Sequence, residues 1–351
     1  MVDDDVEMVI YIAEGLLVVV ANVPVALVIF FSAKFKNARE FTFIGGLCLA
    51  DSIYGCAYAV VGALGTRIYA SGEQNECSWL PWLFLSLVGY QSIALMTLLI
   101  SVDRLVAVYF PTWHLNVMTL RKKTSILIVI FSLILSTTPL AWLIQSSTAE
   151  GVQMLSSECY VSEGLIANLW SYVLCFRAVV IAASCLVYIP IGRKLREMAL
   201  KNVSGHKSQL SKNRKLVHLT VTTAITTAIS LFLLVIPDIV FFVNAANVAA
   251  KHHVLLNLFS LANCVINVVV YNLRHRELRR ALVVVVFNCL GRTETKVSCG
   301  KRVLFNTATD FQPNACRVNS GLALRLDRSG EFDAGHEHDV LSVRSLHSFT
   351  T

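Results

Sequence analysis

Ionisable side chains interrupt several long apolar stretches of this chain, and they are the residues best placed to do chemistry. An ionised group at the centre of a lipid bilayer costs about 2.5 to 3.5 kcal/mol, so something must offset that cost. Examples are Asp51, Asp103, Arg104, Arg177 and Asp238. Each therefore needs either an internal partner or a functional reason for its position.

Asp51 has polar company in other apolar stretches. Asn22 lies in the first stretch, and Asn263 and Asn267 in the last are four residues apart and share one helix face. Together these four residues predict a polar cluster inside a helical bundle. Each asparagine alone could serve only as a hydrogen-bonding link between helices. Asp51 is harder to explain in that way.

Arg177 and Asp238 carry opposite charges in two later stretches. Charges in lipid usually face the interior of a bundle and find a partner there. The two side chains can pair with each other, or either can meet a polar ligand group in a pocket between helices. The sequence leaves both interpretations open.

Metal and enzyme chemistry have little support in the sequence. The ten cysteines are spread singly, with no CxxC pair and no Cys/His cluster at metal-ligand spacing. An intramembrane hydrolase needs several acidic or histidine side chains that converge, and the apolar stretches hold too few. A retinal-binding protein needs a lysine in the last stretch, and Val254 to Tyr271 contains none. We expect no metal, no cofactor and no enzymatic activity.

The elements that hold these residues are helices long enough to cross a membrane. The chain has 351 residues, 55% of them hydrophobic and only 15% charged, and about 20 apolar helical residues cross a bilayer. Seven spans fit, and they predict an all-α membrane protein. They run from Val9 to Phe31, Phe41 to Leu64, Trp82 to Val108, Ser125 to Leu143, Leu169 to Ile191, Leu216 to Phe242 and Val254 to Tyr271.

Positive charge lies almost entirely on one side of these spans, as expected for cytosolic loops. The other side carries only Arg67 and Lys251. An odd number of crossings then places the N-terminus outside and the C-terminus in the cytosol. This arrangement also explains the net charge of +7 without nucleic acid as a partner. The cytosolic cations include Lys34, Lys36, Arg39, Arg121, Lys122, Lys123, Arg193, Lys194, Arg196, Arg274, Arg276, Arg279 and Arg280.

The spans also carry an ordered set of motifs. The third ends in Asp103-Arg104, with Pro111 seven residues after the arginine. This set resembles the signatures of rhodopsin-like G-protein-coupled receptors, and the resemblance covers about residues 8 to 290. The matching residues are Asn22, Asp51, the Asp103-Arg104 pair, Tyr188, Pro237 and the run from Asn267 to Tyr271.

The resemblance implies an activation switch. Asp103 would hold Arg104 at rest, and activation would free the arginine toward Tyr188, Tyr271 and a heterotrimeric G protein. Pro237 would bend the sixth span into a lever that swings outward. Asn22, Asp51, Asn263 and Asn267 would form the family's sodium and water site, and an extracellular ligand would be the second partner.

Several motif positions depart from the family pattern. Leu105 replaces the motif tyrosine, and Val268 replaces the proline of the seventh span. Leu231 and Val235 stand where aromatic residues are usual before Pro237. Two further departures are Ile93, in place of a serine of the sodium site, and the absence of an acid near Val217 to pair with Arg104. We therefore expect a loosely held resting state, and the pattern most resembles the nematode serpentine chemoreceptors of the Srsx class.

The flanking segments complete the expected organisation. By the same resemblance, Cys77 and Cys159 would form a disulfide on the extracellular face, in an oxidising compartment. The expected parts are an extracellular N-terminus (1–8), a receptor domain (9–272), an amphipathic eighth helix and juxtamembrane segment (273–290) and a disordered cytosolic tail (291–351). Cys289 is a palmitoylation candidate, and serines and threonines in the tail would be sites for a kinase and arrestin.

The sequence therefore predicts a multi-pass plasma-membrane receptor for a chemosensory cue or small peptide. The alternative is a ligand-gated channel or transporter with seven spans. Transporters often show internal repeats, and none is visible here. Seven-helix channels of the insect olfactory type place the N-terminus in the cytosol, against the charge pattern.

Overall fold

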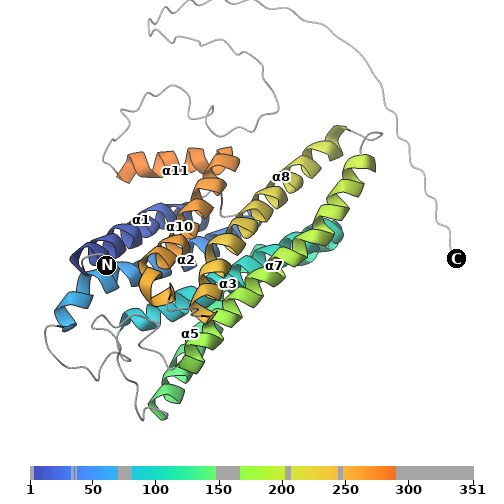
Figure 1. Cartoon of the computed structure of the whole chain (residues 1–351). Helices are drawn as coiled ribbons and strands as arrows, with labels where there is room; N and C mark the ends of the chain where they lie inside the picture. Colours follow the sequence, from blue (N-terminus) through green and yellow to red (C-terminus); the bar gives the residue numbers. More distant parts are fainter. Residues whose placement is uncertain are drawn as a thin grey trace, which may run out of the picture. The chain divides into compact units, whose positions relative to one another are not determined.

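The described part of this computed structural model is helical, and it belongs to one compact unit, Met1–Thr293. The structure describes residues 4–32, 35, 38–69, 81–147, 167–201, 207–243 and 248–289. The helices in chain order are α1 (Asp4–Phe31), α2 (Thr42–Tyr69), α3 (Pro81–Tyr109), α4 (Pro111–Val117), α5 (Leu120–Ser147), α7 (Ala167–Lys201), α8 (Lys207–Ser230), η3 (Leu231–Val235), α9 (Ile236–Val243), α10 (Val248–Arg274) and α11 (Arg276–Cys289) (Figure 1).

Seven helices in the described ranges are long and apolar enough to cross a membrane, which confirms the predicted seven-helix bundle. They are α1, α2, α3, α5, α7, the continuous α8–η3–α9 and α10. The structure extends some of them beyond the predicted bounds: α1 begins at Asp4 and α7 ends at Lys201. Hydropathy detects only the lipid-facing length of a helix, so a polar extension into water escapes it.

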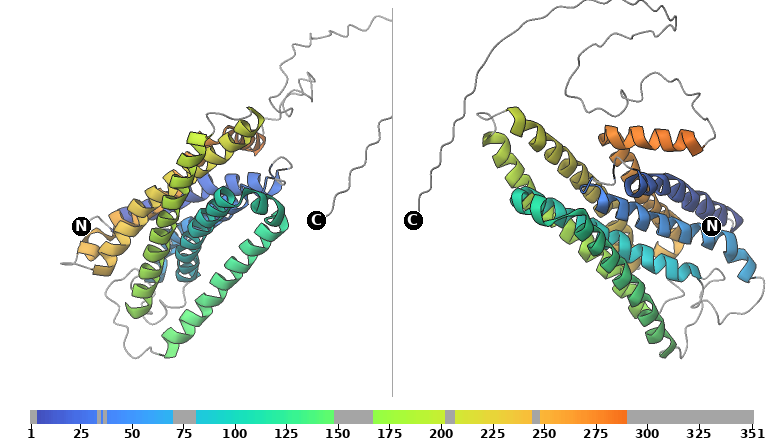
Figure 2. Two further views of the ribbon diagram at one scale, coloured as in Figure 1. Left: turned by 90° about the vertical axis from the view of Figure 1, so that its right-hand side faces the viewer. Right: turned by 180° about the vertical axis from the view of Figure 1, so that it is seen from behind.

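Helix α3 occupies the middle of the bundle. It packs against α2 and α7 and also contacts α4, α5 and α8. Helix α5 touches the bundle mainly through α3 and α2, and most of its surface faces outward (Figure 2). Helix α10 packs against α1, α2, α8, η3 and α9. Residues from α3 therefore meet side chains from most of the other helices.

The close approach of α1 and α2 depends on small residues. A Cβ atom added at Gly15 would lie 2.5 Å from the backbone oxygen of Gly55 and from the backbone nitrogen of Ala59. Without a hydrophobic driving force between helices in lipid, such backbone-to-backbone packing supplies much of the association energy. Residues Asn22 and Asp51 are positioned by this contact, since they lie on the two helices that it joins.

The α8–η3–α9 helix contains a π-helical segment that the sequence did not reveal. Residues Leu231–Val235 form η3, and only Ile236 separates this segment from Pro237. Proline lacks the backbone N–H that an α-helix requires, and π-bulges often accompany local helix distortions at functional sites. The predicted bend at Pro237 therefore coincides with a change of helix type.

The short helix α11 follows α10 after His275 and runs in a different direction (Figure 1). Its apolar side contacts the bundle: Leu278 is fully buried, and α11 packs on α1. Arg276, Arg279 and Arg280 are exposed. The predicted amphipathic eighth helix is thus present, with its basic side available to a membrane surface.

Candidate functional site

The end of α3 that the charge pattern assigns to the cytosol carries a buried group of ionisable residues. Asp103 and Arg104 form a direct ion pair, and both are almost completely buried. The Asp103 carboxylate also lies 3.0 Å from His114 Nε2 and 2.5 Å from Lys123 Nζ. We call these four residues the Asp103 cluster.

The members of the Asp103 cluster come from three helices. Asp103 and Arg104 lie in the last two turns of α3, His114 lies on α4, and Lys123 lies in the first turn of α5. Lys123 is fully buried, with its ammonium group 5.1 Å from the centre of the Phe43 ring. A buried carboxylate that meets two cationic side chains and an imidazole has its charge well compensated. His114 was not predicted as a site residue, and Lys123 was predicted only as one of many cytosolic cations.

The short helix α4 is also attached to the loop between α1 and α2. Arg39 Nη1 donates a hydrogen bond to the carbonyl oxygen of Leu115 at 2.7 Å. On its other side, α4 contributes His114 to the Asp103 cluster. Helix α4 is thereby fixed against the end of α3, where the family resemblance expects a G protein to bind.

The predicted polar cluster is assembled partly as expected. Asn22 Nδ2 donates to the carbonyl oxygens of Val18, at 3.0 Å, and Cys264, at 3.3 Å, so it links α1 to α10. Asp51 is fully buried beside Cys264 and Asn267, yet neither carboxylate oxygen has a hydrogen bond of normal geometry to a described residue.

The other members of the predicted polar cluster have mixed partners. Asn263 Oδ1 accepts a hydrogen bond from Ser230 Oγ at 2.9 Å. The side-chain oxygen of Asn267 is buried without a partner among the described residues. Unsatisfied buried oxygens on Asp51, Asn22 and Asn267 are the chemistry that a cation or ordered waters would satisfy. Ile93, which replaces a serine of the family's sodium site, is buried and offers no oxygen.

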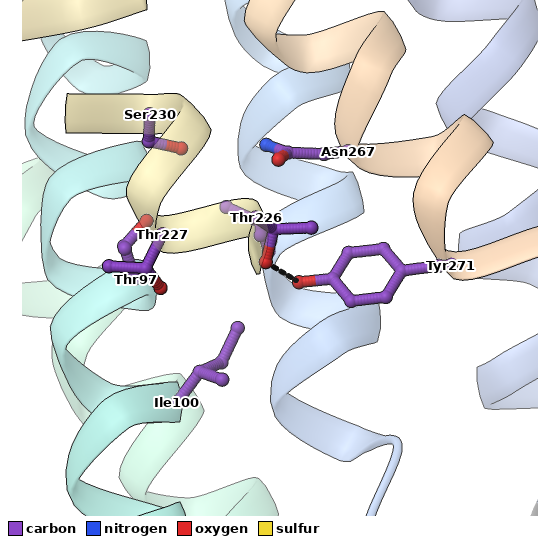
Figure 3. Close-up of a pocket in the computed structure, with 8 residues that line it drawn as sticks. Thr97, Ile100, Thr226, Thr227, Ser230, Asn267 and Tyr271 are labelled. Atoms are coloured by element: carbon purple, nitrogen blue, oxygen red, sulfur yellow. Dashed lines mark hydrogen bonds between the residues drawn. The ribbon is translucent and has the colours of Figure 1, made fainter. Parts of the chain in front are cut away.

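A second polar layer lies between α3, α8 and α10, toward the Asp103 cluster. Thr226 and Tyr271 meet here, with their hydroxyl oxygens 3.3 Å apart (Figure 3). The space between the side chains is too narrow for a water molecule. The layer is lined by Leu47, Thr97, Ile100, Thr226, Thr227, Ser230, Asn267 and Tyr271.

Hydroxyl groups continue along the buried side of α8. Thr222, Thr223 and Thr227 each donate to a backbone carbonyl one turn earlier in α8. Threonines that bond to their own helix satisfy their hydroxyls internally and often bend the helix. The inner side of α8 is therefore polar but needs few bonds from its neighbours.

The two tyrosines of the predicted switch do not bond to Arg104 in this structure. Tyr271 is bonded to Thr226, and the buried hydroxyl of Tyr188 has no partner among the described residues. Arg104 is instead held by Asp103. This arrangement matches the expected resting contacts, whereas the switch itself stays a prediction.

In the outer half of the bundle, Arg177 on α7 and Asp238 on α9 form a buried pair. Arg177 Nε donates to Asp238 Oδ2 at 2.7 Å, and Nη2 donates to Oδ1. The guanidinium lies 3.8 Å from the centre of the Tyr90 ring on α3. Its third nitrogen, Nη1, is buried without a hydrogen-bond partner among the described residues. The two charges thus compensate each other, and the pair leaves one donor without a partner among the described residues.

Aromatic residues surround this pair and connect it to the first helices. Tyr90 meets Tyr54 and Trp170 in edge-to-face contacts with ring centres 5.1 and 5.6 Å apart. Tyr54 donates to Tyr58, and Tyr58 donates to Asn257 Oδ1 at 3.0 Å. Buried tyrosine hydroxyls usually need a partner, and the hydroxyls of Tyr54 and Tyr58 both have one. The outer half is a connected polar and aromatic region.

Other predicted residues fall outside the described side chains. Cys77 and Cys159 lie outside the described residues, and Cys289 ends α11 with an undescribed side chain. Among the described residues, no group of three metal-ligating side chains converges.

Seven apolar helices, a buried Asp-Arg pair at the end of the third and a distorted sixth define a seven-helix signalling receptor. The family model of the 7 transmembrane receptor (rhodopsin family) matches residues 21–271, which is most of the chain. The chain belongs to this family of multi-pass membrane receptors. A comparison with curated protein sequences gave no match. Family membership implies a G protein and an extracellular ligand as partners, and receptors of this family are generally signalling proteins rather than enzymes.

Proposed function

We propose that this receptor binds an extracellular chemosensory cue or small peptide and activates a heterotrimeric G protein by outward movement of α8. The observation that carries the proposal is the burial of the Asp103–Arg104 ion pair at the cytosolic end of α3. A buried arginine held by one carboxylate is a group that a binding partner can take over, because guanidinium groups form strong charge-assisted hydrogen bonds with several acceptors.

The lever for this movement is the α8–η3–α9 helix. The π-helical segment and Pro237 weaken its regular hydrogen bonding at one point. The hydroxyl-rich inner side of α8 favours opening, since water that enters meets polar groups rather than bare hydrocarbon. Movement of α8 would break the Thr226–Tyr271 contact and free Tyr271 toward Arg104. Asn267, which lies on α10 like Tyr271, would move together with it.

The ligand would bind near the Arg177–Asp238 pair in the outer half. The unsatisfied Nη1 of Arg177 is a donor for a carbonyl or carboxylate group, and Tyr90 and Trp170 offer aromatic surface beside it. Ligand pockets are mostly apolar with a few directed polar groups. A disulfide between Cys77 and Cys159 would cover this region.

Further details follow from the family resemblance. We place the receptor in the plasma membrane and nearest to the nematode serpentine chemoreceptors. The predicted polar cluster would hold water or a cation, and Ile93 would supply no oxygen to that cation. Its members are Asn22, Asp51, Asn263 and Asn267. Kinase and arrestin would act on the tail, and Cys289 would carry a palmitoyl group.

The test is nucleotide exchange on a panel of G proteins, with membranes that contain the intact chain or Arg104→Ala at equal surface expression. We expect basal exchange from the intact chain, and we expect Arg104→Ala to lower it to the level of membranes without receptor. Arg121→Ala is the matched control, because Arg121 is an exposed arginine at the start of α5.

A different result would redirect the interpretation. If Arg104→Ala and the intact chain gave equal exchange above background, coupling would not run through this arginine. If neither promoted exchange and a whole-cell current tracked expression, the chain would be a channel.

A further inference from the structure

The joint between α10 and α11 contains a histidine in an unusual position. The backbone N–H of His275 donates to the carbonyl oxygen of Tyr271 at 2.9 Å. Its own carbonyl oxygen accepts from the N–H of Arg279 at 3.0 Å. The backbone is therefore fixed on both sides, and the imidazole is presented to the neighbouring helices in one orientation.

The imidazole of His275 lies between two other rings. Phe41, which precedes α2, meets it edge to face with ring centres 5.3 Å apart. On the other side, His218 near the start of the α8 span meets it edge to face at 5.6 Å. The His275 Nε2 atom is buried and has no hydrogen-bond partner among the described residues. The imidazole is thus half-buried, and the described neighbours offer its Nε2 atom no hydrogen-bond acceptor.

The charges around this ring are mostly positive. Arg274 on α10, Arg104 on α3 and His218 on α8 oppose protonation, and only Glu277 on α11 favours it. Burial is the largest effect, and with these cations it lowers the pKa of His275 from its ordinary value of 6.5 to about 4. Arg274 is further engaged with α8, since its Nε donates to Thr222 Oγ1 at 3.2 Å. The contact between α8 and the α10–α11 joint therefore disfavours protonation of His275.

We propose that His275 is a binding site for a cytosolic proton, so that acidification of the cytosol favours the active receptor. This inference rests on the proposed outward movement of α8. That movement carries His218 and Thr222 away from the joint, and water then reaches the buried Nε2 atom of His275. The open state binds the proton, whereas the resting state excludes it. Intracellular pH would thus act as a second input beside the extracellular ligand.

The sign and size of the effect follow from linkage. The pKa of His275 is lowered in the resting state. The resting state therefore loses stability relative to the open state as pH falls from about 6.5 toward 4. If the open state restores the ordinary pKa of about 6.5, the opening constant rises about threefold to fourfold between pH 7.4 and pH 6.0. Most of the change lies below pH 7, within the range of an acidified cell.

A second histidine lies at the same end of the bundle. His114 Nε2 is 3.0 Å from Asp103 Oδ1 and faces the Asp103 cluster. A variant at His275 isolates the proposed site, since His114 is present in both proteins.

The test compares the full-length receptor with and without His275→Phe in nanodiscs, with one purified G protein, from pH 7.4 to pH 6.0. Phenylalanine keeps an aromatic ring between Phe41 and His218 but cannot bind a proton. The ratio of the two exchange rates cancels the pH dependence of the G protein. We expect this ratio to rise threefold to fourfold toward pH 6.0. His252→Asn, at an exposed histidine near the outer end of α10, should leave the pH profile unchanged.

A second readout needs no G protein. Thr223 is buried on the inner side of α8, so a cysteine introduced by Thr223→Cys should react with a water-soluble maleimide only when α8 moves outward. The ratio of labelling rates with and without His275→Phe should rise toward pH 6.0 by the same factor. Parallel samples without Thr223→Cys correct for the native cysteines.

These readouts separate the possible failures. A labelling ratio that stays flat with pH overturns the proton site, whatever the exchange rates show. Absent exchange together with a rising labelling ratio supports the proton site and contradicts G-protein coupling. If His275→Phe does not fold, His218→Asn replaces it. This variant removes the ring that packs on His275, so it should expose His275 in the resting state and flatten the pH profile. An unchanged pH profile would overturn the proposal.

Discussion

At the scale of single residues, the Arg177–Asp238 pair offers the clearest energetic test. Both side chains are almost fully buried, so removing one leaves a charge in a medium that cannot solvate it. We expect Asp238→Asn to cost about 3 to 5 kcal/mol of stability. The double variant Arg177→Met with Asp238→Leu removes both charges and should recover most of this loss. Thermal unfolding of the purified receptors in detergent measures both effects.

The double variant also separates two roles of the pair. A purely structural pair predicts that stability and basal exchange recover together. If Arg177 contacts the ligand, the stable double variant would lose its response to any extract that activates the intact receptor. Equal unfolding temperatures for Asp238→Asn and the intact chain would contradict the structural role.

Some candidate site residues were visible in the sequence because their chemistry conflicts with their surroundings. Asp51, Arg104 and Arg177 are charges in lipid-length apolar stretches, and the structure buries all three. His275 gave no such signal, since histidines beside basic loops are common. Its environment depends on Phe41 and His218, which are distant in sequence. Only the folded bundle brings them together.

At the scale of the elements, Lys123 determines how firmly α5 is attached to α3. Helix α5 has few other contacts, and its buried ammonium group lies 2.5 Å from Asp103. We expect Lys123→Met to lower the stability by about 2 to 3 kcal/mol, less than a fully broken pair costs, because Asp103 keeps Arg104 and His114. Lys122→Met, at the exposed neighbour, is the matched control and should change little.

Thermal unfolding at neutral pH measures this difference. If both lysine variants unfolded at the same temperature as the intact chain, a structural role for Lys123 would be contradicted. The comparison is specific, because the two substitutions remove the same charge from adjacent positions.

The existence of each spanning helix was predictable, but its finer structure was not. A run of apolar residues predicts a span because lipid requires every backbone group to be bonded within the helix. The π-helical segment Leu231–Val235 contains ordinary apolar residues, and only Pro237 pointed to a local distortion. Helix α4 is too short and too polar for a hydropathy pattern to detect. Such features depend on tertiary contacts rather than on composition.

At the scale of the whole molecule, the uneven distribution of lysine and arginine determines which side of the bundle faces the cytosol. The Asp103 cluster, His275 and the basic side of α11 all lie at the end that this rule assigns to the cytosol. The Arg177–Asp238 pair lies nearer the other end. The proposed signal therefore passes from the ligand region through the polar layers between α3, α8 and α10.

This orientation is directly testable in intact cells. We expect an epitope tag before Met1 to bind antibody without permeabilisation, and a tag after Thr351 to bind only once the plasma membrane is permeabilised. The physical reason is that cationic segments such as the one with Arg121, Lys122 and Lys123 are retained in the cytosol, and an odd number of spans separates the two termini. Each tagged protein serves as the control for the other. An N-terminal tag that needs permeabilisation would place the Asp103 cluster outside the cell, which would exclude G-protein coupling and favour the channel alternative.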